Sequence, residues 1–117
     1  MEKNYCYFFT AQNMSAEQQL VQTAHVALKL GVLSTRQVAP VTDVTPVGKF
    51  DPDNTYFTVI GVRNEDALLA VKLILDKFGY QYETFYEPDQ EQVTSIALYP
   101  ILESQRGPLM AFNLLKM

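Results

Sequence analysis

The stretch YCYFFTAQNMSAEQQLVQTAHVALKLG, residues 5–31, decides the fold, because it joins a strand to a helix that carries its own start signal. The aromatic run Tyr5–Thr10 is typical of a buried β-strand. Ser15 and Gln18 have the spacing of a capping box, in which each side chain bonds the other residue's backbone N–H. The spacing therefore predicts a helix over Ala16–Leu30, directly after the first strand.

This first helix is predicted to be two-sided, and Gly31 is predicted to end it. Its apolar residues recur at helical spacing and are expected to pack on the sheet: Leu20, Ala24, Ala27 and Leu28. Four polar residues follow i, i+4, i+7 and i+11 and share another face: Gln18, Gln22, His25 and Lys29.

The rest of the chain alternates strands and helices. The expected elements are the strand Tyr56–Val62, the helix Glu65–Phe78 capped by Asn64 and closed by Gly79, the strands Tyr82–Tyr86 and Val93–Tyr99, and the segment Leu109–Leu115 returning to the sheet or packing on it. Between the helices and strands lie the acidic turn Glu87–Gln92, the loop or helical turn Pro100–Pro108, and the proline-punctuated connection Val32–Asn54, with a short helical turn near Ser34–Val38.

This order predicts an α/β fold. A mixed sheet of four or five strands carries two long helices, and the first crossover joins parallel strands. At 117 residues the chain, 1–117, is expected to be a single domain.

The composition narrows the classes of function. The net charge is −4 and no run of Lys or Arg occurs, which argues against duplex DNA as a partner. Cys6 is the only cysteine and His25 the only histidine, so we expect neither a metal site nor a cofactor. No apolar run is long enough to span a membrane, and the N-terminal residues lack a signal-peptide core; we therefore expect a cytoplasmic protein.

Four residues are candidates for chemistry. His25 on its helix is a candidate general base, although a lone helix histidine is more often structural. A Cys6–His25 nucleophile pair is the weaker alternative, since a cysteine in an aromatic strand usually behaves as a small hydrophobe. Glu87 ends a predicted strand and can lean over the sheet edge, whereas Thr94 by itself reads as a good strand residue.

Three segments resemble one known family. Gln22-Thr23-Ala24-His25-Val26-Ala27 is similar to the Gln-x-x-His-Ala-Ala segment of the archaeal and eukaryotic (type II) peptidyl-tRNA hydrolases. The stretch Phe57–Leu69 resembles their second strand and second helix start, and Thr94–Pro100 resembles their Thr-x-Leu-Gly-Ile-Gly-Pro strand. The order and spacing agree from Tyr5 to Pro100, so the chain is expected to share that family's fold as a divergent member.

The resemblance also implies a site and an activity. The family hydrolyses the ester that joins a stalled peptide to the 3′ ribose of tRNA, a step in translation, without a metal. By position, His25, Glu87 and Thr94 match catalytic residues: His25 would activate water, Glu87 would orient the imidazole and Thr94 would hydrogen-bond the ester. Gln18 stands where the family has a lysine, and the loop Glu87–Gln92 lacks the family's arginine.

Two functions follow from this comparison. One is hydrolysis of peptidyl-tRNA, or of a related aminoacyl or nucleotide ester, with the tRNA acceptor end as the partner. The other is a catalytically inactive binding or regulatory module on the same fold, in which Gln18, Gln22 and His25 form a hydrogen-bonding floor for a small ligand or a protein partner. The sequence leaves a homodimer open.

Overall fold

The computed structural model describes residues 3–35 and 53–112. The elements are, in chain order, β1 (Asn4–Ala11), α1 (Ala16–Thr35), β2 (Thr55–Val62), α2 (Glu65–Lys77), β3 (Tyr82–Glu87), β4 (Gln92–Leu98) and β5 (Ile101–Leu102), followed by the 3₁₀ turns η1 (Glu103–Gln105) and η2 (Gly107–Ala111). Most of the predicted connection Val32–Asn54, and the residues after Phe112, lie outside the described residues.

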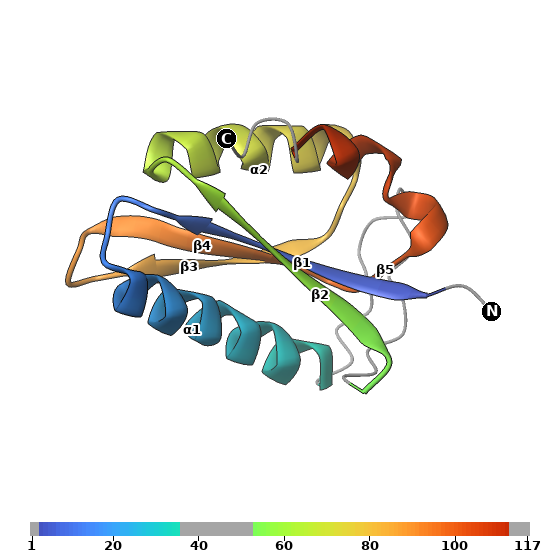
Figure 1. Cartoon of the computed structure of the whole chain (residues 1–117), viewed down its shortest axis with the longest axis horizontal. Coiled ribbons are helices and arrows are strands. Elements are labelled where there is room, and N and C mark those ends of the chain that lie inside the picture. Colours follow the sequence, from blue (N-terminus) through green and yellow to red (C-terminus); the bar gives the residue numbers. More distant parts are fainter. Residues whose placement is uncertain (1–2, 36–52, 113–117) are drawn as a thin grey trace.

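The strands form one mixed sheet in the order β2-β1-β4-β3, with β5 also paired to β1. β1 and β2 are parallel, whereas β4 runs antiparallel to both of its neighbours. The prediction of an α/β protein with a mixed sheet and a parallel first crossover is confirmed. Figure 1 shows three layers, with α1 on one face of the sheet and α2, η1 and η2 on the other.

The two edges of the sheet differ. β3, at one edge, carries Glu83 and Glu87, and the Lys29 Nζ bonds its Thr84 carbonyl at 2.8 Å. β2, at the other edge, is an unbroken run of eight residues without a charge or a proline. Charged side chains on an edge strand discourage pairing with another chain, so β3 has a protection that β2 lacks.

The helix starts follow the sequence. The Ser15 N–H donates to the Gln18 Oε1 and the Gln18 N–H donates to the Ser15 Oγ, both at 3.1 Å, which completes the capping box. Asn64 caps α2 by accepting the Ala67 N–H at 3.1 Å. Gly79 follows α2 with a φ of 75°, the left-handed conformation that glycine adopts most readily.

The prediction that Gly31 ends the first helix is wrong. α1 continues to Thr35, and Gly31 is one of its interior residues. A β-carbon built at Gly31 would meet nothing within 4 Å, so packing does not require a glycine there. Glycine has a low helix propensity, and the rest of the helix compensates for it.

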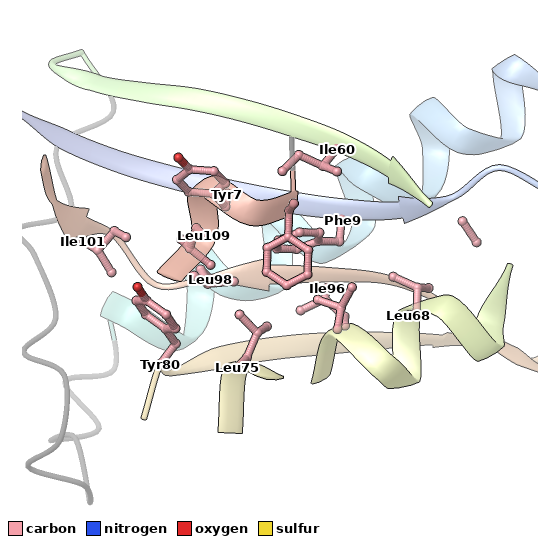
Figure 2. Close-up of a cluster of buried hydrophobic side chains, with 13 residues drawn as sticks. Tyr7, Phe9, Ile60, Leu68, Leu75, Tyr80, Ile96, Leu98, Ile101 and Leu109 are labelled. Atoms are coloured by element: carbon pink, nitrogen blue, oxygen red, sulfur yellow. The ribbon is translucent and has the colours of Figure 1, made fainter. Parts of the chain in front are cut away.

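The larger core lies between the sheet and α2. Tyr7 and Phe9 of β1 meet Ile96 of β4 and Leu68 and Leu75 of α2, and Figure 2 shows these side chains pointing toward one another. The predicted packing of Leu109–Leu115 is confirmed for its described part, since Leu109 and Phe112 are buried in this core. Arg106 also fixes the tail, because its Nε donates to the Tyr7 hydroxyl at 2.8 Å.

The predicted packing face of α1 is wrong for Leu20, Ala24 and Leu28, which are exposed; only Ala27 of the four packs against a core. Leu20 and Leu28 are 72% and 69% exposed, and the buried residues among the described side chains of the helix are Gln22, Val26 and Leu30. The smaller core between α1 and the sheet is correspondingly modest, with Val26 and Leu30 against the sheet residues Cys6, Phe8 and Ala97. We call the exposed apolar residues the outer stripe of α1: Leu20, Val21, Ala24, Leu28 and Val32.

None of the helices in residues 3–35 and 53–112 is both long and apolar enough to cross a membrane.

Candidate functional site

Gln22 is the centre of a buried polar network between α1 and the sheet. The residue is only 3% exposed, yet both polar atoms of its side chain and its backbone carbonyl have hydrogen-bond partners. The amide Nε2 donates to the Glu87 Oε2 at 3.2 Å, and the Oε1 accepts from the Thr94 hydroxyl at 2.8 Å. The backbone carbonyl accepts from the Ser95 hydroxyl at 3.0 Å. A polar residue can therefore occupy the packed side of this helix without an unmet hydrogen bond.

A β-bulge aims Thr94 at the helix. In the β3–β4 pair Phe85 lies opposite Ser95 and Tyr86 lies opposite Val93, so Thr94 is the extra residue. Strand alternation alone would put Thr94 on the α2 side with Ile96, and a bulge is the usual device that re-aims a side chain. Both Thr94 and Ser95 consequently reach Gln22.

Glu87 reaches the same network from the end of β3. Its second carboxylate oxygen, Oε1, accepts the Asp89 backbone N–H at 3.2 Å, which anchors the turn that follows. Both carboxylate oxygens are thus engaged, one by the turn and one by Gln22.

His25 lies beside this network. Its exposed imidazole stacks on Phe85, with ring centres 4.6 Å apart and planes 4° from parallel. Within the part of the chain that the structure describes, no hydrogen bond joins the imidazole to Glu87 or Thr94. The carboxylate expected to orient His25 instead holds the Gln22 amide.

The remaining candidates have separate positions. Gln18 is exposed and its side chain is used by the capping box. Cys6 is fully buried, its thiol donates to the Leu98 carbonyl at 3.3 Å, and burial raises its pKa to about 12. The exposed His25 does not share that position, so the alternative Cys6–His25 pair is not assembled. Among the described residues, no three His, Cys, Asp or Glu side chains group as metal ligands.

A groove that the sequence reading missed lies on the opposite face, between β2 and α2. It has a volume of about 480 Å³. Its lining is Ile60, Val62, Arg63, Asn64, Asp66, Ala67, Ala70, Val71, Ile74 and Phe112. α2 packs mainly over β4 and β1, so β2 is less covered on this face although its Ile60 is buried.

The groove has an apolar floor and a polar mouth. Ile60, Ile74 and Phe112 belong to the apolar lining. Exposed Arg63 precedes the N-cap Asn64, and exposed Asp66 lies in the first turn of α2. The available sequence signal was the pair of alanines, Ala67 and Ala70, because small residues three apart leave space on one helix face.

A comparison with protein-family models and with proteins of curated function finds no match to this chain.

Proposed function

We propose that this chain is a non-catalytic binding module that holds a small amphipathic ligand in the groove between β2 and α2. The groove itself carries the proposal. Its volume of about 480 Å³ lies within the range of small-molecule sites, and such sites are typically apolar with a few polar groups that orient the ligand.

The state of the expected catalytic residues supports binding over hydrolysis. Thr94 is fully buried and its hydroxyl already donates to Gln22, so it is not offered to a substrate ester. Glu87 holds Gln22 and a turn amide, and His25 stacks on Phe85. A general base needs its orienting partner and its substrate within hydrogen-bonding reach, and this arrangement favours neither.

The lining chemistry favours a monocarboxylate with an apolar body. The Arg63 guanidinium can pair with a carboxylate through two parallel hydrogen bonds, and the start of α2 adds a positive partial charge. Asp66 in the first turn of α2 also lines the groove and disfavours a more highly charged anion such as a phosphate.

The experiment is a titration of ¹⁵N-labelled protein with decanoate, followed by NMR. We expect saturable shifts of the Ala67, Ala70 and Ile74 amides, and weaker binding of decanol and decylammonium. Arg63→Gln should weaken decanoate binding about fivefold, the equivalent of roughly 1 kcal/mol for a solvent-exposed ion pair. It should leave decanol binding unchanged.

A matched pair of variants locates the ligand. Ala70→Phe fills the groove and should abolish binding of both probes. Leu73→Phe adds an aromatic ring to the same helix at a position that is 71% exposed and outside the groove, so it should bind as wild type. Equal binding by the two variants would refute the groove as the site.

The hydrolase expectation has its own assay. Purified peptidyl-tRNA is incubated with the protein and with its Gln18→Lys variant, which restores the lysine of the resembling family. We expect no release of free tRNA from either. Turnover that His25→Ala lowers by about 10²–10⁴-fold, the usual contribution of a general acid–base group, would show instead that the chain is a hydrolase.

A further inference from the structure

Exposed apolar side chains occur in two places on the α1 side of the molecule. The first is the outer stripe of α1, which runs through Leu20, Leu28 and Val32 on the side of the helix that faces away from the sheet. The second is β2, where Phe57 and Val59 share the α1 face of the sheet with Phe8 and are 53% and 52% exposed. α1 packs on β4, β3 and β1, so β2 lies beyond its cover.

The outer stripe of α1 is not an ordinary solvated helix surface. α1 has two charged residues in twenty, Glu17 in its first turn and Lys29, which is bound to β3. α2 provides the comparison, because its exposed surface mixes Leu69 and Leu73 with exposed charged residues such as Lys72 and Asp76. A surface helix normally presents its polar face to water, and α1 presents its apolar one.

We propose that two copies of this chain associate through this side, the outer stripe of α1 in each copy covering Phe57 and Val59 of the other. The two α1 helices lie side by side in one layer, with a sheet on either side of them. Such a contact is related by a two-fold axis and is self-complementary, since each copy offers one uncovered helix and one uncovered strand.

The dimensions fit this arrangement. Packed helices lie about 8–10 Å apart, and strands in a sheet are about 4.8 Å apart. β4, which α1 covers, is separated from β2 by β1 alone, a distance of about 10 Å at that spacing. A second helix laid beside α1 therefore lies over β2.

The available apolar area reaches the lower end of the range for a stable contact. A large apolar side chain that is between about two fifths and three quarters exposed presents on the order of 100 Å². The outer stripe without Ala24 has four large residues. Together with Phe57 and Val59 they offer roughly 600 Å² per copy, against about 800 Å² per partner in a standard interface.

The test is the mass of the protein in solution, measured by light scattering after gel filtration at micromolar concentration. We expect twice the chain mass for the wild type and a single chain mass for Leu28→Glu and for Phe57→Glu. Leu73→Glu is the control, because Leu73 is as exposed as Leu28 but lies on α2. Val59→Lys provides a second strand variant, and circular dichroism establishes that each variant is folded.

Each other outcome overturns the proposal in a defined way. A wild type of single chain mass means that another molecule, or nothing, covers this side. A dimer lost in Phe57→Glu and retained in Leu28→Glu places the contact at the edge of β2. A dimer lost only in Leu73→Glu places it on α2.

Discussion

Gln22 and Thr94 form one buried unit, and their hydrogen bond can be tested by a double-mutant cycle. Thr94→Val leaves the Gln22 Oε1 without its donor in a site closed to water. We expect a loss of about 1–3 kcal/mol in the free energy of unfolding, the usual cost of an unpaired buried polar group. Gln22→Leu with Thr94→Val should cost less than the sum of the single changes, because the double variant leaves neither partner unpaired.

Urea unfolding measures these free energies. Thr84→Val on β3 is the control, since its hydroxyl bonds no group among the described residues. Additive costs for Gln22→Leu and Thr94→Val would contradict a direct interaction between the two side chains.

The Cys6 thiol makes stability depend on alkaline pH. Burial raises its pKa from an ordinary 9.0 to about 12, so the unfolded chain releases the thiol proton at lower pH than the folded one. The contribution of the protonated thiol to the free energy of unfolding is therefore complete below pH 9 and is lost as the pH rises toward 12. One fully linked proton changes the unfolding free energy by about 1.4 kcal/mol per pH unit.

Cys6→Ala isolates this effect. Tyr80, whose pKa burial also raises to about 12, contributes to the slope in both proteins and cancels in the comparison. We expect urea unfolding between pH 9 and 11 to show a shallower loss of stability in Cys6→Ala. Parallel pH dependences would mean that the folded thiol ionises as readily as a free one.

The residues of the polar network show what the sequence could predict. Gln22, Glu87 and Thr94 were named as candidates, and they do meet. However, Thr94 arrives through a bulge, and strand alternation gives no sign of an extra residue. The stacking of His25 on Phe85 was equally hidden, because it depends on the register between a helix and a strand that are distant in the chain.

Two glycines test what ends a helix. Gly79 has a φ of 75° after α2, so Gly79→Ala should cost about 1–2 kcal/mol, the strain of an L-residue in the left-handed region. Gly31 lies inside α1 with open space where a β-carbon would go, so Gly31→Ala should gain about 0.5–1 kcal/mol. Thermal unfolding compares the two, and changes of the same sign would refute this assignment.

The sequence predicted the helices and strands well where residues close together in the chain determine them. The capping box at Ser15 and the Asn64 cap fixed the helix starts, and the aromatic runs fixed β1 and β2. The packing face of α1 was misjudged because apolar spacing was assumed to mark the buried side. In this helix Gln22 is buried by its partners on β4 and β3, and Leu28 is left outside.

At the scale of the whole molecule, the topology was within reach of the sequence and the open surfaces were not. Parallel neighbouring strands need a crossover connection, usually a helix, and the parallel pairing of β1 and β2 follows this rule. The groove beside α2 and the uncovered side of β2 depend instead on which strands each helix lies over, and periodicity does not encode that choice.

The unequal edges of the sheet set a limit on misassembly. When strands of different copies pair edge to edge, a sheet with two open edges can add copies without end and grow into a fibre. Here Glu83, Glu87 and the Lys29 contact discourage pairing at the β3 edge. Of the two edge strands in the described order, only β2 has no charged residue. Two copies joined at β2 would turn a guarded β3 to the solvent at both ends, so growth along the sheet would stop at two.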